Sequence, residues 1–535
     1  MAEDILDVLV VGAGPVGLFC ANELTRHGIR CRIIDKKAGL SDKSKALAIH
    51  IRTLDVLEDC GFIEEFLAQG LKVDGVLLKA HGRLLVDVNF SLVEGDRHYL
   101  IDLPQDKTEQ ILYAELMAKG LKVEWQTELT GIEPVSNHTI ATLKQADGSN
   151  EQVNAAWIIA CDGSHSTLRH LVNADFLGST YKEVWWLADL LIDWNLPENK
   201  MALFVTHHGP MAAFPMGNKR YRLVLVAPEG STINDTPTMQ DIEQAFKQRC
   251  SESATLSNPL WITQFGIHHR QIQQYRHGGV FFAGDAAHIH SPMGGQGLNT
   301  GIQDIYNLIW KLALVKKGLA QDSLLDSYHK ERYPIGKEVL KKTDFLTKLI
   351  TIRNPFLIYS RNTLVRFITS FKFVKRYFTR DMAELSISYA NSPIVKTLGI
   401  PTKFKIGEFA PNFSFTDIHS KEKKQLHQMI QGTMHHLFLF AGQTKSQFPA
   451  LLETAALINQ QFKEIIQVHV VLSDSNEALH LDSVLIDDNQ EVHQQFAIQQ
   501  TTALLIRPDK YIGLTQAPVN KDSLLAYMKT IYISK

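Results

Sequence analysis

The sequence of 535 residues predicts an α/β fold whose first part is built on a buried parallel sheet. Three observations predict this class. An apolar run at residues 5–11 ends in glycine, a helical pattern follows at 15–27, and a second apolar run at 31–34 ends at Asp35. Apolar runs closed by glycine are typical of parallel strands that are buried on both faces. The three segments together predict a β-α-β unit of about thirty residues, the size expected of a Rossmann-like domain.

Composition and charge exclude several classes of protein. The chain has 55 Lys plus Arg against 57 Asp plus Glu, so we expect no nucleic-acid partner, which would favour a basic excess. The chain has no run of about 18 uncharged apolar residues and no signal-like start, so we expect a cytoplasmic protein without a membrane span. Five scattered cysteines without a CxxC pair exclude a disulfide scaffold and a zinc ribbon.

The turn after the first predicted strand is rich in glycine. Residues 12–17 read GAGPVG, a GxGxxG pattern that follows a strand and opens a helix. Gly12 permits the tight turn, Gly14 lets the backbone approach a pyrophosphate, and Gly17 allows close contact between helix and strand. Asp35, at the end of the second strand, is placed to bind a ribose hydroxyl. These residues predict a dinucleotide site, and they do not choose between FAD and NAD.

Two further motifs also follow predicted strands. They read CDGSHSTLR at 161–169 and GDAAHIHSPMGGQGLN at 284–299. Asp162 and Asp285 therefore lie at the carboxyl ends of strands, where ligands gather in open α/β sheets. The second motif opens a predicted helix at about 297–317, whose first N–H groups favour an anion such as a reduced flavin. Taken alone, the motif at 161–169 favours a turn with an N-capped helix, and the motif at 284–299 is equally compatible with a glycine-rich loop before a packing helix.

In this order, the three motifs resemble the class A flavoprotein monooxygenases, the p-hydroxybenzoate hydroxylase-like aromatic hydroxylases. Asp162-Gly163 and Gly284-Asp285 match the DG and GD motifs of that family, and Ser44, Arg52-Thr53-Leu54 and Leu103-Pro104-Gln105 are further matches. The resemblance implies FAD contacts from Gly12, Gly14, Pro15, Gly17, Asp35, Lys36, Lys45, Arg52, Gln105, Asp162, Gly163, Gly284, Asp285, Gly297, Leu298 and Asn299. It implies that Pro292, Gly295, Gln296 and Gly297 lie beside the flavin ring as catalytic residues.

Two positions depart from the family pattern. Lys45 stands where the family often has arginine near the phosphates, which keeps the charge and loses the bidentate fork. Gln110 stands where an arginine often follows the preceding glutamate. Both departures weaken contacts that the resemblance would otherwise imply, without changing the assignment.

The resemblance also implies a reaction. NADPH or NADH reduces the FAD, and the reduced flavin captures O2 as a C4a-hydroperoxide that hydroxylates a phenolic or polycyclic aromatic ring in a dry pocket. We expect no metal, and the sequence has no second GxGxxG for the nicotinamide cofactor. Two alternatives stay open. One is an epoxidase or halogenase of the same superfamily, although the halogenase WxWxIP motif is absent, and the other is a non-catalytic FAD-bound scaffold.

The strand-rich middle of the chain supplies the substrate candidates. They are Trp185, His207, Met211, Phe214 and Met216, and His207 could deprotonate a phenol. The alternative for each of these residues is that it simply fills a core, as most apolar and aromatic side chains do.

The predicted domains follow from these motifs. Residues 1–180 form the first part of the FAD-binding domain, with strands near 73–102 shared with a substrate-binding β-sheet domain at 181–266. Residues 267–400 complete the FAD-binding domain and add a helical connector. Residues 401–535 resemble the thioredoxin-like third domain of phenol and polyketide hydroxylases, through GEFAPN at 407–412 and RPDKYIG at 507–513. Lys510 stands where glycine is usual in that motif, and no cysteine follows Cys250, which excludes dithiol chemistry. We expect a monomer or a homodimer.

The segment 341–380 differs in composition from the rest of the chain. It carries ten basic residues against one acid, Asp344, with apolar side chains between them. One interpretation is a helix that lies on a membrane surface. The other is a pair of helices packed between domains with a solvated basic face, which the lack of a lipidation or targeting signal favours.

Overall fold

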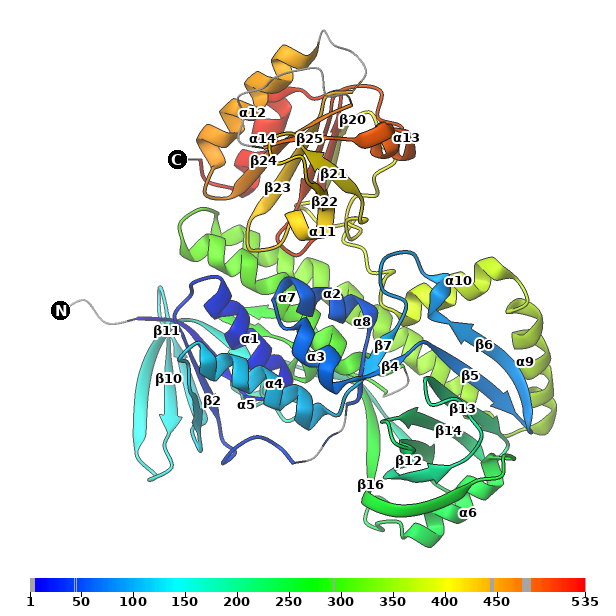
Figure 1. The fold of residues 1–535 in the computed structure, drawn as a ribbon. Coiled ribbons are helices and arrows are strands. Elements are labelled where there is room, and N and C mark those ends of the chain that lie inside the picture. Colours follow the sequence, from blue (N-terminus) through cyan, green and yellow to red (C-terminus); the bar gives the residue numbers. More distant parts are fainter. Residues whose placement is uncertain are drawn as a thin grey trace. The chain divides into compact units, whose positions relative to one another are not determined.

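The computed structural model describes residues 5–42, 44, 46–291, 294–442, 447–473 and 483–534. They form a mixed α/β protein with two compact units, whose elements are labelled in Figure 1. Unit 1 contains Met1–Asn22, Arg30–Ile305 and Pro334–Leu385, and unit 2 contains Glu23–Ile29, Tyr306–Tyr333 and Ser386–Lys535.

The first sheet of unit 1 has a parallel centre. Strand β1 (Leu6–Val11) pairs in parallel with β2 (Cys31–Asp35) and with β11 (Asn150–Ala160). Strand β18 (Val280–Phe282) adds in parallel beside β11, and β8 (Val123–Trp125) adds in parallel beside β2. Helix α1 (Pro15–Arg26) connects β1 to β2, so the predicted β-α-β unit is confirmed. The antiparallel additions are β9 (Glu128–Pro134), β10 (Thr139–Lys144) and β17 (Arg276–His277).

The second sheet of unit 1 has the strand order β19-β16-β12-β15-β14-β13-β5-β6. Its members are β5 (Gly75–Ala80), β6 (Arg83–Asn89), β12 (Phe176–Asp193), β13 (Lys200–Thr206), β14 (Gly209–Pro215), β15 (Arg220–Val226), β16 (Thr255–Ile272) and β19 (His288–Ile289). The long strands β12 and β16 cross positions 180 and 266, where the sequence predicts domain boundaries. Those boundaries stay a prediction.

A third, three-stranded sheet joins β3 (Ala48–Ile49), β7 (Leu100–Asp102) and β4 (Leu71–Val73) in that order. The remaining helices that contribute to unit 1 are α2 (Ile51–Asp59), α3 (Ile63–Gln69), α4 (Gln105–Ala118), α5 (Thr167–Leu171), α6 (Met239–Arg249), α7 (Gln296–Lys316), α8 (Asp326–Ile350), α9 (Pro355–Ile368) and α10 (Lys372–Met382). Helix α6 interrupts the stretch that the sequence predicts to be strand-rich, and Thr238 and Asp241 form a capping box at its start. Within the described part of the chain, every helix is too short or too polar to span a bilayer.

Unit 2 is built on an eight-stranded sheet with the order β20-β27-β26-β23-β24-β25-β21-β22. The strands are β20 (Lys396–Gly399), β21 (Ser414–Asp417), β22 (Lys423–Gln425), β23 (His435–Phe440), β24 (Ile466–Leu472), β25 (Val484–Ile486), β26 (Thr502–Ile506) and β27 (Ile512–Ala517). Its own helices are α11 (Leu426–Met429), α12 (Phe448–Phe462), α13 (Glu491–Phe496) and α14 (Lys521–Ile531). One core cluster joins apolar residues of α12, α14 and β23 to Trp310 and Leu314 from the later part of α7.

The two motifs noted near the end of the chain pair with each other in unit 2. The Gly407 N–H donates to the Ile512 carbonyl at 2.8 Å, and the Ala410 N–H donates to the Lys510 carbonyl at 2.9 Å. Lys510 has a φ of +66°, the left-handed conformation that favours glycine. This conformation explains why lysine at 510 is unusual for the motif.

Candidate functional site

The three glycine-containing motifs meet at one edge of the first sheet. Val11, at the end of β1, is paired with Ile34 of β2 and with Ala160 of β11. Ala160 is in turn paired with Phe282 at the end of β18. Because these strands are parallel, the segments that follow them leave the sheet at the same carboxyl edge. Motifs far apart in the sequence are thus brought together where open α/β sheets bind ligands.

The first glycine-rich turn has two glycines fixed by packing and one that faces open space. A Cβ atom at Gly12, where φ is +102°, would lie 2.3 Å from the Cys161 carbonyl oxygen. A Cβ atom at Gly17 would lie 1.8 Å from the Gly12 carbonyl oxygen. At Gly14 a Cβ atom would meet nothing within 4 Å. Gly14 therefore leaves room at the N-terminus of α1, as the close approach of a pyrophosphate requires.

Asp35 supports this turn from the end of β2. Its Oδ2 accepts the Ala13 N–H at 2.8 Å, and its Oδ1 accepts the Lys37 N–H at 2.9 Å. A carboxylate oxygen has a further lone pair, so Asp35 retains capacity for a ribose hydroxyl. Lys36, the neighbouring predicted residue, is exposed.

Asp162 has one oxygen bound and one unsatisfied. Oδ2 accepts the Leu168 N–H at 3.2 Å, whereas the buried Oδ1 has no hydrogen-bond partner among the described residues. Burial raises the pKa of this carboxyl, and hydrogen bonds from Ser166 and from backbone N–H groups oppose the rise. Because buried polar atoms are rarely left unpaired, Oδ1 fits a site that receives a ligand donor.

Arg169 joins the second and third motifs, a role that the sequence analysis missed. Its Nη2 donates to the Ser164 carbonyl at 2.7 Å, and its Nη1 donates to the Ala286 carbonyl at 3.2 Å. The guanidinium lies 4.0 Å from the centroid of the Phe176 ring. Ser166 caps the short helix α5, because its side chain accepts the Arg169 N–H.

The start of the third motif is fixed by a buried acid from α7. The Gly284 N–H donates to Asp304 Oδ2 at 3.1 Å, and His288 Nε2 lies 2.8 Å from the same oxygen. Asp285, between them in the sequence, is exposed at the carboxyl edge of the sheet. This arrangement leaves Asp285 placed to accept a ligand hydroxyl.

The second glycine-rich turn is held by groups around β3. Gly294 and Gly295 have φ values of +91° and +65°, and His50 Nε2 lies 2.7 Å from the Gly294 carbonyl oxygen. The Asn299 amide donates to the carbonyls of Ala48 and Gly295 and accepts the His50 N–H. Asn299, a predicted FAD residue, thus stabilises the turn, and its contact with the cofactor stays a prediction.

The electrostatics of this turn come from the helix rather than from histidine. Burial lowers the pKa of His50 to about 4, so His50 is neutral near pH 7. The first N–H groups of a helix have no partner within it and carry partial positive charge. Gln296, Gly297 and Leu298 form this first turn of α7. Lys45 and Pro292, two other predicted site residues, lie outside the described residues.

Gln105 and Arg52 also lie in buried or half-buried positions near β3. Gln105 Oε1 accepts the Ala46 N–H at 3.1 Å, and its Nε2 donates to Glu109 at 2.9 Å. Arg52 is buried on α2, with Nη1 3.1 Å from Asp55 Oδ2. Both side chains are held in place by the protein, as residues that line a cofactor should be.

A buried polar cluster that the sequence analysis missed joins this region to the second sheet. Arg222 donates through Nε and Nη2 to both oxygens of Asp189 at 2.8 Å, and through Nη1 to the Ala46 carbonyl at 3.3 Å. Asp102 is 2% exposed, and neither of its carboxylate oxygens has a partner among the described residues. Burial raises the pKa of Asp102 well above its usual range, and Arg222 only partly opposes this. Charged residues inside the apolar runs WWLADLLID and RYRLVLV were the available signal.

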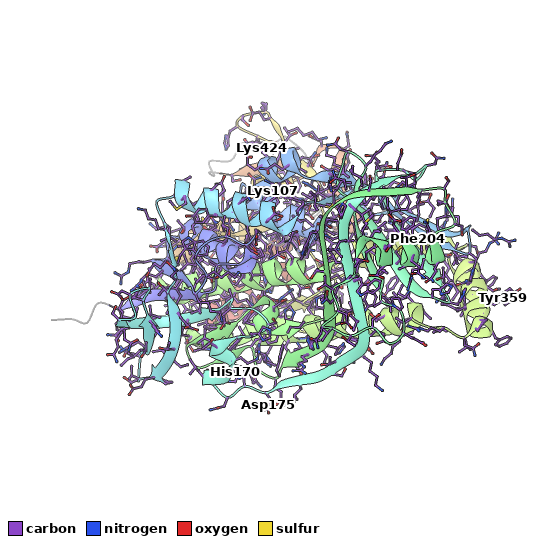
Figure 2. The ribbon with its side chains drawn as sticks, turned by 90° about the horizontal axis from the view of Figure 1, so that it is seen from below. Lys107, His170, Asp175, Phe204, Tyr359 and Lys424 are labelled. Carbon is purple, nitrogen blue, oxygen red and sulfur yellow. The ribbon has the colours of Figure 1, made fainter. Side chains whose placement is uncertain are left out.

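The five substrate candidates do not gather at one place. Trp185 and Phe214 belong to one cluster, whereas Met211 packs in another, with residues of α6 and with Phe204, which is labelled in Figure 2. His207 lies exposed in the turn between β13 and β14, and Met216 follows β14. The structure therefore does not place all five side chains in one pocket. The face with Trp185 and Phe214 also carries Arg222, because side chains alternate along a strand.

Comparison with known proteins gives one matching family. Residues 5–343 match the family described as FAD binding domain. Among curated proteins, the chain is 30% identical to 6-methylpretetramide 4-monooxygenase of Streptomyces rimosus over 534 residues, which cover 98% of this chain and 93% of that protein. It is 32% identical to pentachlorophenol 4-monooxygenase of Sphingobium chlorophenolicum over 349 residues, 64% of each chain.

Solved structures agree over nearly the whole chain. OxyS anhydrotetracycline hydroxylase from Streptomyces rimosus superposes with a TM-score of 0.77 at 27% identity, covering 98% of this chain and 99% of that one. A ternary complex of aklavinone-11 hydroxylase with FAD and aklavinone has a TM-score of 0.75 at 21% identity, covering 99% of each chain, and shows likeness of fold.

Proposed function

The chain belongs to the FAD-binding-domain family and is an FAD-dependent monooxygenase, and from this premise we propose that it hydroxylates a phenolic or polycyclic aromatic substrate with NADPH or NADH as the reductant and O2 as the co-substrate. The observation that carries the proposal is the meeting of three glycine motifs at the carboxyl edge of one parallel sheet. Two relatives, named 6-methylpretetramide 4-monooxygenase and pentachlorophenol 4-monooxygenase, support the substrate class.

The residues at this edge suit FAD. The open space at Gly14 and the N-terminus of α1 would receive the pyrophosphate, and Asp35 the ribose. The unsatisfied Oδ1 of Asp162 and the exposed carboxylate of Asp285 would accept hydroxyl donors of the cofactor. Bound FAD would supply the redox and oxygen chemistry, which no side chain provides.

The start of α7 would act on the isoalloxazine ring. The N–H groups of Gln296 and Gly297, with Gly295 before them in the turn, would stabilise negative charge on the reduced ring. Because His50 is neutral, this stabilisation would depend on backbone dipoles fixed by Asn299. Such donors require no reorganisation during the reaction.

The face of the second sheet with Trp185 and Phe214 is the proposed substrate wall. Its apolar side chains would exclude water from the reacting ring, which limits loss of reducing equivalents to H2O2. Arg222, held by Asp189 and by the Ala46 carbonyl, would link this wall to the segment that lines the flavin. His207 is exposed in a turn, which favours Trp185 and Phe214 over His207 as substrate contacts.

For unit 2 we infer a thioredoxin-like domain without redox function. The strands β23 and β24 are parallel and connected through α12, and β26 and β27 are antiparallel beside them. All five cysteines of the chain lie at or before position 250, so none belongs to the later strands and helices of unit 2. The domain is therefore proposed to be structural.

Turnover of NADPH and NADH tests the proposed reaction. The purified protein is assayed for their oxidation with and without a panel of phenols and polycyclic aromatics, while H2O2 is quantified. Strong stimulation with little H2O2 is expected from a substrate. Stimulation with all electrons recovered as H2O2 would identify an effector only. Absence of oxidation from a protein that holds FAD would overturn the proposed reductant.

A substitution at Gly14 tests the cofactor site. The side chain of Gly14→Val would fill the space assigned to the pyrophosphate, so we expect the purified protein to lose its FAD absorbance. Gly266→Val is the matched control, because a Cβ atom at Gly266 also meets nothing within 4 Å. A Gly14→Val protein that purifies with full FAD content would show that the pyrophosphate lies elsewhere.

A further inference from the structure

Exposed aromatic side chains are concentrated in one segment of unit 1. Among the described residues, every exposed Phe, Tyr or Trp lies between positions 345 and 378. They are Phe345, Phe356, Tyr359, Phe367, Phe371, Phe373, Tyr377 and Phe378. Phe356, Tyr359 and Phe373 are 74%, 72% and 72% exposed, respectively. Such a gathering of exposed apolar side chains marks an interaction surface.

Helix α9 turns its aromatic side to solvent and its opposite side to the protein. Ile358 and Arg361 are buried, and the helix packs against β6. Tyr359 and Phe367 follow Phe356 by three and eleven positions, so the three side chains lie together on the opposite face of the helix. In Figure 2, Tyr359 projects from the outer side of this helix. The apolar face of α9 is thus the exposed one, the reverse of an ordinary surface helix.

Helix α10 repeats this arrangement with basic residues beside the aromatic ones. Thr379 is buried, whereas Lys372, Phe373, Arg376 and Tyr377 are exposed. Lys372 and Arg376 are four positions apart, as are Phe373 and Tyr377, so the two pairs form adjacent stripes. We call the exposed sides of α9 and α10 together the aromatic–basic surface.

The charge of this segment is opposite to that of the remaining chain. Residues 341–380 carry a net charge of +9 in a chain whose net charge is −2. Carboxylates pair with Lys342, Lys348, Arg353 and Arg376. In the described part of the chain, Arg366, Lys372 and Lys375 have no carboxylate partner. Positive charge therefore remains around the exposed aromatic side chains.

We propose that the aromatic–basic surface binds the surface of an anionic lipid bilayer. Aromatic rings are favoured at the boundary between headgroups and acyl chains, and Lys and Arg are attracted to anionic headgroups. A second copy of the same surface would bring two positively charged faces together, which opposes self-association. The sequence alone favours a packed helix pair with a solvated basic face. That arrangement should bury its aromatic residues, and the structure exposes them.

Vesicle binding tests this proposal, which does not depend on the reaction at the flavin site. The full-length protein with its FAD is sedimented with vesicles of phosphatidylcholine alone or mixed with phosphatidylglycerol, at low and high salt. We expect binding to the phosphatidylglycerol vesicles that weakens with salt, and little binding to phosphatidylcholine alone. Each Lys or Arg near an anionic surface contributes about fivefold to the binding constant.

Two variants separate the apolar and electrostatic contributions. The variant with Phe356→Ser, Tyr359→Ser, Phe373→Ser and Tyr377→Ser should lose most vesicle binding. Lys372→Glu with Lys375→Glu should weaken it by about 25-fold or more, since two attractive charges are removed. The matched control is Leu177→Ser with Leu260→Ser, which removes side chains that are 53% and 67% exposed elsewhere in unit 1. FAD absorbance reports that each variant is folded.

Three results would overturn the proposal. The first is a wild-type protein that does not sediment with phosphatidylglycerol vesicles at low salt. The second is an aromatic variant that binds them as tightly as the wild type. The third is a wild-type dimer that the aromatic substitutions convert to a monomer, without vesicle binding by either protein, because a second copy would then cover this surface.

Discussion

Buried charges in the two units are satisfied to different degrees. In unit 1, Arg222 is bound by Asp189 and by a backbone carbonyl, while Asp102 is buried without a hydrogen-bond partner among the described residues. In unit 2, two cations and two anions that are at most 2% exposed form a closed network. Both units thus bury charged groups, but Asp102 of unit 1 lacks the hydrogen-bond partners that the charged groups of the unit 2 network have.

The network of unit 2 centres on Glu331. Its carboxylate accepts from Arg507 through both oxygens at 2.7 and 2.9 Å, and from Lys311 Nζ at 2.7 Å. Arg507 also binds Asp509, which accepts the Trp310 Nε1–H at 3.2 Å. The basic groups come from α7 and from the RPDKYIG motif, so the network ties that motif to two long helices.

This difference separates a structural role from a proposed functional one. A buried group whose partners are all supplied by the protein fixes the fold, and a ligand is not needed to satisfy it. A buried carboxyl without a partner, such as Asp102 or Asp162 Oδ1, is retained at a cost in stability, which is typical of sites that bind or react. This difference supports the proposal that unit 1 holds the chemistry and that the buried charges of unit 2 are structural.

The largest expected effect is a loss of stability when an ion pair of the closed network in unit 2 is removed. Glu331→Gln keeps the size of the side chain and removes the charge that pairs Arg507 and Lys311. Removing one partner of a buried ion pair typically costs about 3–5 kcal/mol. We expect urea unfolding followed by circular dichroism to show that loss at neutral pH.

Glu453→Gln is the matched control for this substitution. Glu453 pairs with Lys521 at 2.6 Å in the same unit, but its side chain is 66% exposed. Exposed ion pairs often contribute nothing measurable, so the control should unfold as the wild type does. Equal stability of the two variants would show that burial does not distinguish these pairs.

Local sequence pattern was sufficient to predict the backbone of the candidate flavin site. Gly12, Gly17 and the strands around them follow from short motifs, because the turn and its strands are contiguous. Arg222 and Asp189 were not predictable as a pair, since the register between β12 and β15 sets them opposite each other. Asp304 was missed for the same reason, because its partners Gly284 and His288 come from another element. Helix α6 was missed although its capping box, Thr238 with Asp241, is a local signal.

An intermediate effect is expected at Arg222. Arg222→Lys keeps the positive charge beside Asp189 and loses the fork that reaches both carboxylate oxygens and the Ala46 carbonyl. Hydrogen bonds to charged groups are worth about 1.5–3 kcal/mol, which corresponds to about 10- to 100-fold in rate if they position the reacting groups. We expect substrate-stimulated NAD(P)H oxidation to fall by that factor while FAD is retained.

Arg220→Lys provides the comparison, because Arg220 lies on the same strand and its Nη1 donates to the Asn258 carbonyl at an exposed position. Its activity should match that of the wild type. If Arg222→Lys lost its FAD together with its activity, Arg222 would be needed for binding the cofactor and the assignment to the substrate wall would be wrong.

The smallest effect concerns pH, and it has opposite signs in the two units. Burial would raise the pKa of Glu331, but Arg507 and Lys311 hold it well below its usual range. The stabilisation by Glu331 is therefore present above pH 4.5, the ordinary pKa of glutamate, and is lost as the pH falls toward the pKa of the folded state. The difference in unfolding free energy between the wild type and Glu331→Gln should accordingly shrink on acidification.

Asp102 should behave in the opposite way. Burial raises the pKa of Asp102 above 3.8, the ordinary value for aspartate, so above that pH the folded protein binds more protons than the unfolded chain does. Stability therefore falls as the pH rises toward the pKa of the folded state. Asp102→Asn removes this titration, so it should match the wild type in acid and gain relative stability toward neutral pH. Asp175→Asn, at an exposed aspartate, should show no such trend. A loss of stability in Asp102→Asn at neutral pH would mean that Asp102 is ionised and paired with Arg222, and that the buried charges of unit 1 are as complete as those of unit 2.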